Sequence, residues 1–302
     1  MTKPTFHIVS DGSCDLPLPE TEKLGVDTVR FLVSFDGEHY KKEGLEVPLE
    51  DFYQKMVDEP GTYPMTAAPS PDDFCQYFEK YAAAGEDVLC ICISTKLSSS
   101  LQSARIAAQM TEEAYPNARI ILLDSLCATL MQSVLVLEAC RLRDAGLSVE
   151  EAARILTDLR KTARIFFTVG SFDYIQHGGR VGKMTGLAGA LLNVTPLITL
   201  QDGEIHSSGI RRGRRRSLEG ILELLCRYLK EENCTPKDCI IIIGYGHDRE
   251  EGFRLRDMTQ ERFRSLYGES PLLAVHQIGA TIGVHAGPTS IGYGVVRHSS
   301  AV

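Results

Sequence analysis

The sequence predicts an α/β protein of two domains, with a mostly parallel sheet in residues 1–150 and an α+β arrangement in residues 151–302. Strand-like and helix-like segments alternate through the first half, which is typical of βαβ units and a parallel sheet. Residues 88–93 form a continuous apolar run, as expected for a strand buried on both faces. In the second half, strand-like segments pair as hairpins between long helices, so we expect the boundary near residues 146–165.

The composition narrows the class of protein. Of the 302 residues, 43% are hydrophobic and 24% are charged, which is typical of a soluble globular protein. The net charge of −8 disfavours a general nucleic-acid-binding role. The sequence has no signal core, no apolar run long enough to span a bilayer, and no CxxC pair among its nine cysteines. We therefore expect a cytoplasmic protein with reduced cysteines, no metal site and no nucleic-acid partner.

Turn and capping residues divide the first half into its elements. Asp36 and Gly37 predict a tight hairpin turn, and Ser70 followed by Pro71 and Asp73 predicts a helix start. Apolar runs predict strands at 6–10, 29–35, 38–40, 88–93 and 119–123. Periodic patterns predict helices at 21–24, 49–58, 71–84, 99–114 and 128–145.

The second half begins with a helix that Ser148 and Glu151 cap and that runs to about residue 161. Two further helices are expected at 217–230 and 248–267. Strands are expected at 165–169, 197–200, 205–208, 240–245, 272–278 and 292–297. Residues 170–193 are rich in glycine and other small residues and match no periodic pattern.

The segment after the buried strand at 88–93 is rich in hydroxyls and leads directly into a helix. In a parallel sheet this junction lies at the carboxyl edge of the strands, where ligands usually bind. The hydroxyls of Ser94, Ser98 and Ser99 and the N–H groups of the helix N-terminus would together form an anion site. The alternative is ordinary capping by Ser98 or Ser99, and that arrangement is the more common one when the loop is considered alone.

Other polar motifs have plainer interpretations. Asp11 and Asp15 follow the first strand, where a turn with Asx hydrogen bonds explains them better than a metal site. Asp124 closes another strand, where a helix cap is slightly favoured over a ligand contact. The segment GGRVGK at 178–183 resembles a phosphate loop only superficially, because its spacing fits neither a P-loop nor a dinucleotide fingerprint. We therefore expect no ATP or NAD site and no cofactor.

The chain also contains a dense basic block, with five arginines among residues 211–216. Like charges so close together repel one another, which favours an anionic ligand, an acidic partner or an anionic membrane surface over a solvated loop. RNA is less favoured because the block has no aromatic platform. His285 lies among glycines and small residues, which favours a cleft position where it hydrogen-bonds an acid, and His247 is its rival.

These motifs follow one another in an order that resembles the DegV family of bacterial fatty-acid-binding proteins. The segments are IVSDGSCDLP, TAAPS with PDDF, ISTKLSSSLQSA, DS, GGRVGK, an R-x-R pattern before a helix, and VHAGP followed by a glycine. They cover nearly the whole chain, so the resemblance is specific although each motif alone is weak. The family includes the acyl-carrying subunit of fatty acid kinase.

The resemblance implies a two-domain fold with one long-chain fatty acid buried between the domains. It implies that Thr66, Ser98 and His285 hold the carboxylate, and that the family's arginine near the headgroup falls on Arg212, with Arg214 next to it. It further implies a carrier that catalyses nothing and hands the bound acid to a separate ATP-dependent kinase, which makes the acyl-phosphate.

The sequence departs from the family pattern at three places. Ala67 and Ala68 replace a hydroxyl and an amide in TAAPS, Ser99 replaces a glycine in LSSSL, and Thr289 replaces a glycine in HAGPTSIG. These departures concern the geometry around the headgroup and leave the lipid-binding expectation in place. Residues 184–192 are small and apolar, and they are a candidate wall of the tunnel for the acyl chain.

Two alternatives from other functional classes remain open. One is an enzyme for a small phosphorylated or carbonyl substrate, because the α/β domain of the family resembles that of dihydroxyacetone kinases. It would require His285 or Asp124 as a catalytic group. The other is an anion- or RNA-binding regulator that uses the arginines at 211–216. For the carrier, we expect the same arginines to make transient contact with an anionic membrane or with the kinase.

Overall fold

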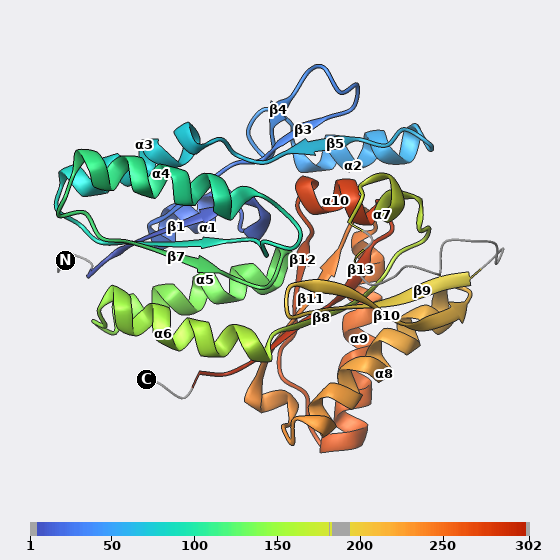
Figure 1. Cartoon of the computed structure of the whole chain (residues 1–302). Coiled ribbons are helices and arrows are strands. Elements are labelled where there is room, and N and C mark those ends of the chain that lie inside the picture. The colour runs from blue at the N-terminus through green and yellow to red at the C-terminus, as the bar shows by residue number, and fades with distance from the viewer. Residues whose placement is uncertain (1–4, 181, 183–193, 300–302) are drawn as a thin grey trace.

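The computed structural model describes residues 5–180, residue 182 and residues 194–299. It shows two halves that lie side by side (Figure 1), the first half in blue to green and the second in yellow to red. Each half contains a sheet that helices cover, so the α/β class predicted from the sequence is confirmed.

The described residues of the first half contain a four-stranded parallel sheet in the order β2-β1-β6-β7. Its strands are β1 (His7–Asp11), β2 (Val26–Val29), β6 (Val88–Cys92) and β7 (Ile120–Asp124). The helices are α1 (Leu18–Leu24), α2 (Leu49–Asp58), α3 (Pro71–Ala83), α4 (Ser100–Ala114), α5 (Thr129–Asp144) and α6 (Val149–Leu159). Helices α3 and α4 cover one face of the sheet, and α5 and α6 cover the other (Figure 1). Every residue of β6 is buried, as its continuous apolar run predicts.

The predicted helix starts at Ser70 and Ser148 are confirmed, and both are capping boxes. Ser70 Oγ accepts from the N–H of Asp73 at 3.2 Å, and the Asp73 carboxylate accepts from the N–H of Ser70 at 2.9 Å. Ser148 and Glu151 make the same reciprocal pair at the start of α6. The predicted division after residue 150 falls inside α6, and this helix packs against α5 and β7.

Part of the segment 29–35, which was predicted as one strand, belongs to a second, small sheet. In the described residues, three strands pair antiparallel in the order β4-β3-β5. They are β3 (Leu32–Ser34), β4 (Lys41–Lys42) and β5 (Met65–Ala67). The prediction of a single strand at 29–35 is therefore wrong. The chain leaves the parallel sheet after Val29, buries Phe31 and then joins the small sheet.

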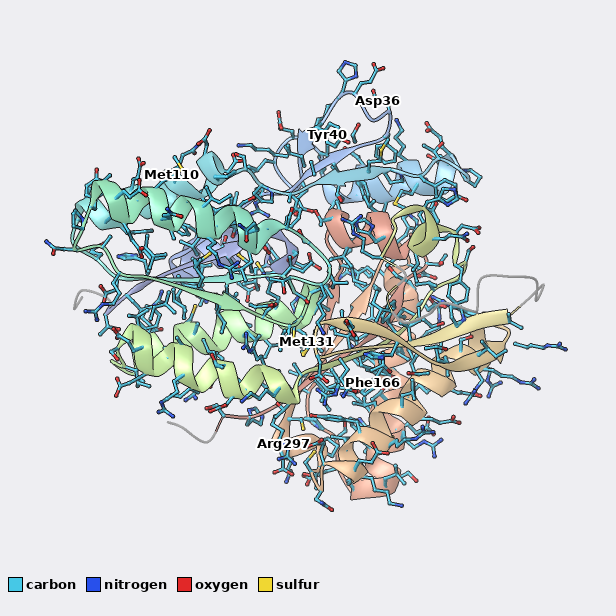
Figure 2. The ribbon with its side chains drawn as sticks, in the orientation of Figure 1. Asp36, Tyr40, Met110, Met131, Phe166 and Arg297 are labelled. Atoms are coloured by element: carbon cyan, nitrogen blue, oxygen red, sulfur yellow. The ribbon has the colours of Figure 1, made fainter. Side chains whose placement is uncertain are left out.

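The loop after β3 does not form the predicted strand at 38–40. The Asp36 carboxylate accepts hydrogen bonds from the N–H groups of Glu38 and His39, at 2.9 and 2.8 Å. Because the loop itself uses these donors, pairing with β3 begins only at Lys41. Asp36 lies at the outer end of this loop in Figure 2.

The second half contains a mixed sheet of six described strands in the order β10-β9-β8-β13-β11-β12, in which β11 and β12 pair parallel and the other neighbours antiparallel. The strands are β8 (Arg164–Thr168), β9 (Val194–Gln201), β10 (Glu204–Arg212), β11 (Cys239–Tyr245), β12 (Ala274–Gln277) and β13 (Ile291–Arg297). Helices α8 (Arg214–Glu231) and α9 (Arg249–Tyr267) cover one face (Figure 1), and α5 of the first half contacts β11 and β13. Short 3₁₀ turns among the described residues are η1 (Gly12–Cys14), η2 (Arg160–Thr162) and η3 (Pro236–Asp238).

Several elements of the second half differ from the prediction. The short helices α7 (Asp173–His177) and α10 (Ala280–Ala286) were not predicted. Strand β10 and helix α8 are both longer than expected and leave only Gly213 between them. The arginine block is therefore not a loop, because its first two arginines end a strand and the other three form the first turn of α8.

The hydrophobic core runs without interruption from one half to the other. Met131 of α5 is fully buried and lies between the two halves in Figure 2. A Cβ added to Gly294 of β13 would lie 2.7 Å from Met131 Cε, so helix and sheet meet closely at this glycine. Within the described residues, no helix is long and apolar enough to cross a membrane.

Candidate functional site

An apolar cavity of about 310 Å³ lies where the two halves meet. The first half contributes residues around β6 and α5, and the second half contributes residues of β8, β13 and α10. Large apolar side chains dominate the lining, including Phe31, Met131, Phe167, Leu200, Ile278 and Tyr293. The cavity therefore exists only when both halves are in place.

Five residues with polar side chains gather where this cavity meets a second, more polar pocket. They are Thr66, Ser98, Ser99, Arg180 and His285, which we call the cavity mouth. Ser98, Ser99 and Arg180 also line the second pocket, which has a volume of about 480 Å³. Thr66 Oγ1 lies 3.2 Å from His285 Nε2, although the two residues are 219 positions apart. Thr66, Ser98 and His285 thus line one cavity, as expected from the sequence.

His285 is the most constrained side chain of the cavity mouth. Burial, with a smaller contribution from Arg180, lowers the pKa of His285 to about 4, so the ring is neutral at physiological pH. Its Nδ1 is buried and has no hydrogen-bond partner among the described residues. A Cβ added to Gly178 would lie 2.2 Å from this nitrogen, so the ring fits only because residue 178 is glycine.

The loop after β6 directs two serines into the cavity mouth at the N-terminus of α4. Ser98 is half-buried, and its Oγ accepts a long hydrogen bond of 3.2 Å from the N–H of Ser100. Ser99 occupies the N-cap position, but among the described residues its side chain forms no cap hydrogen bond. Capping therefore accounts for Ser98 in part and leaves Ser99 unexplained. An anion here would face the positive end of the helix dipole.

Two residues predicted to contact the ligand do not line the cavity in the described structure. Ser94 is fully buried, and its Oγ donates to the carbonyl of Gly203 at 2.9 Å. It therefore fixes the loop to the turn between β9 and β10 instead of facing a ligand. Arg212 is exposed at the end of β10, because this strand continues four residues past its predicted end at residue 208. Arg180 supplies the cation of the cavity mouth instead.

The arginine block is largely paired within the protein. Arg211 pairs with Glu223 at 3.0 Å, and Arg215 pairs with Glu219 at 3.1 Å. These glutamates relieve the repulsion that favoured a functional use of the block, which weakens the case for an anion- or RNA-binding regulator.

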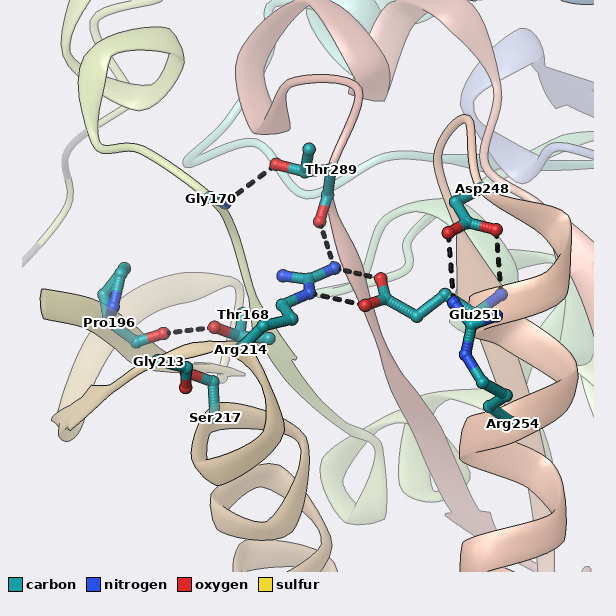
Figure 3. A network of polar contacts seen from close by, with 10 residues as sticks. All are labelled: Thr168, Gly170, Pro196, Gly213, Arg214, Ser217, Asp248, Glu251, Arg254 and Thr289. Carbon is teal, nitrogen blue, oxygen red and sulfur yellow. Dashed lines mark hydrogen bonds and ion pairs between the residues drawn. The ribbon is translucent and has the colours of Figure 1, made fainter. Parts of the chain in front are cut away.

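Arg214 forms the most buried contact of the block (Figure 3). Its guanidinium binds both carboxylate oxygens of Glu251, with Nε 2.8 Å from Oε1, and donates to the carbonyl of Thr289 at 2.7 Å. Thr289 Oγ1 in turn accepts from the N–H of Gly170 at 2.9 Å. Thr289 follows α10 closely, so α8 and α9 hold the segment next to His285 in place.

The opposite end of α10 is held by two acids from the first half. Glu43 Oε2 accepts from the N–H of Thr281 at 2.8 Å, and the Asp15 carboxylate accepts from the N–H of Gly279, the N-cap residue of α10. Burial raises the pKa of Asp15 to about 7 and that of Glu43 to about 8. Contacts from both halves therefore position the helix that carries His285.

The remaining acidic motifs have structural partners. Asp11 accepts from Ser13 Oγ at 2.7 Å, from the N–H of Ile93 at 3.0 Å and from Gln132 Nε2 at 2.8 Å. It therefore joins β1 to the loop after β6 and to α5, and the predicted turn with Asx hydrogen bonds is wrong. Asp124 accepts from the N–H of Leu126 at 3.0 Å and does not cap α5, whose N-cap is Ala128. The described residues contain no group of three or more acidic, histidine or cysteine side chains placed to hold a metal ion.

Arg180 is the residue of the cavity mouth that sequence reasoning missed. It lies in the segment GGRVGK, which was weighed as a phosphate loop and counted toward the family resemblance, but without a role for its arginine. The available signal was the cation itself, the sole arginine in a stretch without periodicity at 170–193. The candidate tunnel wall at 184–192 lies outside the described residues.

Comparisons with known proteins agree with this architecture. A family model described as "Uncharacterised protein, DegV family" matches residues 5–298. A DegV domain-containing protein of Deinococcus radiodurans is 30% identical over 288 residues, which cover 95% of this chain and 97% of the relative.

Two solved structures are similar along their whole length. One is described as a fat acid (stearic acid)-binding protein from Eubacterium ventriosum, with 38% identity, a TM-score of 0.91, and coverage of 98% of this chain and 100% of that chain. The other is described as fatty acid binding of a DegV family protein from Thermus thermophilus, with 28% identity, a TM-score of 0.84, and coverage of 97% and 99%. From the family match and a fold shared from end to end, we conclude that this chain belongs to the DegV family.

Proposed function

We propose that this protein is a carrier that binds one long-chain fatty acid, with the acyl chain in the cavity and the carboxylate at the cavity mouth. The observation that carries the proposal is the gathering of Thr66, Ser98, Arg180 and His285 at one end of an otherwise mainly apolar cavity. In this arrangement the Thr66 and Ser98 hydroxyls donate to the carboxylate and Arg180 supplies the opposite charge. The neutral His285 donates from Nε2 to Thr66 Oγ1, which leaves the threonine proton for the ligand.

The two ends of the ligand contribute differently to binding. Each buried methylene contributes about 0.8 kcal/mol, so a long chain contributes on the order of 10 kcal/mol before the costs of association. Hydrogen bonds from the headgroup contribute about 1.5–3 kcal/mol each. The acyl chain therefore sets the affinity, and the cavity mouth sets the orientation.

The fatty-acid ligands named for the similar structures from Eubacterium ventriosum and Thermus thermophilus support the ligand class. We further propose that the protein catalyses nothing itself and presents the acid to a separate ATP-dependent kinase in the cytoplasm, which forms the acyl-phosphate. Support comes from the cavity mouth, where Ser98, Ser99 and Arg180 border the open polar pocket and so leave the carboxylate within reach of a partner. Loading would occur by transient contact with an anionic membrane, for which Arg212 and Arg216 remain exposed.

Mass spectrometry of the protein purified under mild conditions tests the proposal. We expect about one co-purified fatty acid per chain, and neither ATP hydrolysis nor acyl-phosphate when ATP is added to the pure protein. A chain that binds no fatty acid, even when offered hexadecanoic acid, would contradict the carrier function. Acyl-phosphate made by the chain alone would contradict the role as a carrier without catalysis.

A further inference from the structure

The floor of the cavity crosses the sheet of the second half from strand to strand. On each of the neighbouring strands β10, β9, β8 and β13, one lining residue pairs in register with the next, and these residues are Ile205, Leu200, Ile165 and Gly294. On β11 the lining continues with Gly244, which pairs with Gly292 of β13. The cavity floor therefore extends from β10 to β11.

The cavity mouth lies at one end of this floor. Ile205 on β10 borders the second pocket as well as the cavity, together with Ser98 and Arg180 of the cavity mouth. The other end lies at β11, four strand intervals away. Because neighbouring strands are about 4.8 Å apart, the floor is about 19 Å long. An acyl chain whose carboxylate lies at the cavity mouth therefore runs across the strands toward β11.

Two consecutive residues of α5 close the far end of the cavity, each over a glycine of the sheet. A Cβ added to Gly244 would lie 2.8 Å from Leu130 Cδ1, and one added to Gly294 would lie 2.7 Å from Met131 Cε. Leu130 is 5% exposed and Met131 is fully buried. Because β11 is the lining strand furthest from the mouth, Leu130 is the side chain that the tip of an acyl chain meets there.

The length of the floor corresponds to a definite length of acyl chain. An extended hydrocarbon advances about 1.3 Å for each carbon–carbon bond of about 1.5 Å, so about 15 bonds cover the floor. The carboxyl end lies beyond Ile205, at the cavity mouth, which adds up to about two carbons. A chain of about 16 to 18 carbons therefore reaches from the cavity mouth to Leu130.

We propose that Leu130 stops the acyl chain and thereby sets the longest fatty acid that the protein binds with full affinity. This inference rests on the proposed function, because that function places the carboxylate at the cavity mouth. A shorter acid leaves the far end empty, and each added methylene then tightens binding roughly fourfold. An acid longer than the floor must displace Leu130 from its contact with Gly244, so the gain ends there.

Competition binding with a series of straight-chain saturated acids, from dodecanoic to docosanoic acid, tests the proposal. In the wild type we expect the Kd to fall roughly fourfold per added methylene up to about 16 to 18 carbons and not to fall further beyond that length. Leu130→Ala shortens the side chain by about two carbon–carbon bonds, so this break should move to acids about two carbons longer.

Leu200→Ala is the matched control. Leu200 is also a leucine of the cavity lining and is 4% exposed, but it lies on β9, one strand from Ile205 and the cavity mouth. Its truncation removes the same contacts from the middle of the chain path, where every acid of the series passes. We therefore expect Leu200→Ala to weaken all acids by a similar factor and to leave the break at the wild-type length.

The position of the break decides the proposal. A wild-type break outside the expected lengths, no break at all, or a break that does not move in Leu130→Ala overturns it, and so does an equal shift in Leu200→Ala. If Leu130→Ala does not fold, as circular dichroism would show, Leu130→Val is measured and should move the break by about one carbon. A wild-type protein that binds none of the acids contradicts the proposed carrier function, whereas an unmoved break contradicts only the role of Leu130.

Discussion

The cavity mouth and the arginine block are both polar, but the groups of the cavity mouth border an apolar cavity, whereas most arginines of the block pair with glutamates. Arg211, Arg214 and Arg215 are paired with glutamates of their own chain. His285 Nδ1, by contrast, is buried without a partner among the described residues, and Ser99 makes no cap bond there. The comparison teaches that a concentration of charge in a sequence does not locate a ligand site. Unused hydrogen-bonding capacity beside an apolar cavity is the better indicator.

The largest expected effect concerns the pH dependence of stability at the cavity mouth. Because the pKa of His285 is about 4 in the fold and near 6.5 in the unfolded chain, the unfolded chain binds a proton that the native protein does not bind between these pH values. The free energy of unfolding therefore falls as the pH drops through this window. Relative to His285→Gln, the wild type should lose up to about 3 kcal/mol between pH 7 and pH 4.

Urea unfolding of both proteins along this pH series measures the difference. The raised pKa values of Asp15 and Glu43 act in the opposite direction, since that stability is lost as the pH rises, but both acids are present in both proteins and cancel. A difference that does not change with pH would show that His285 is not held neutral.

Arg214→Ala should have the next largest effect, which concerns the stability of the fold. It leaves the carboxylate of Glu251, which is 14% exposed, without its bidentate partner and releases the carbonyl of Thr289. We expect a loss of about 2 kcal/mol in the free energy of unfolding, measured with urea. Wild-type stability in this variant would mean that the arginine is free to serve a ligand after all.

Removing a hydroxyl from the cavity mouth should weaken fatty-acid binding by a smaller amount. Thr66→Ala and Ser98→Ala each lose one hydrogen bond to the carboxylate, or about 1–2 kcal/mol, which is roughly five- to thirtyfold in the Kd for hexadecanoic acid. Calorimetric titration measures this change. Ser94→Ala is the matched control, because its hydroxyl binds Gly203, and it should change stability more than affinity. A larger affinity loss in Ser94→Ala than in Ser98→Ala would reverse our assignment of the two serines.

Arg215→Ala should have the smallest effect. The side chain is 91% exposed and pairs with Glu219 one turn further along α8, a geometry that contributes less than about 0.5 kcal/mol. Urea unfolding of Arg215→Ala and Arg214→Ala under the same conditions compares the two ion pairs directly, since the two residues are neighbours in the same helix turn. Similar losses in both variants would contradict the distinction drawn between a buried and an exposed arginine pair.

Local signals account for the part of the fold that could be predicted. The apolar run of β6 and the capping boxes at Ser70 and Ser148 act over a few residues, and the structure reproduces them. Helix α10 could not be predicted, because it is seven residues long and contains Gly283. It depends on distant contacts, among them the ring of Tyr53, whose hydroxyl would lie 2.6 Å from a Cβ at residue 283.

The candidate site shows the same division between local and distant signals. Thr66, Ser98 and His285 were predicted from the family resemblance that the order of the motifs carries, and all three line the cavity. Ser94 belongs to the same hydroxyl-rich loop as Ser98, and only its contact with Gly203 in the other half separates their roles. Arg180 has no periodic pattern around it, so its place at the cavity mouth follows entirely from the packing of the two halves.

The position of the cavity at the junction links ligand occupancy to the cohesion of the molecule. Met131 of the first half and Phe167 of the second both line it, so a ligand is bound only while the halves are docked. Occupancy then opposes their separation by about 2.7 kcal/mol when free ligand is at one hundred times its Kd. A bound ligand thus holds the two halves together more firmly than an empty cavity does. Amide hydrogens at the junction should therefore exchange faster in the empty protein than in the loaded one.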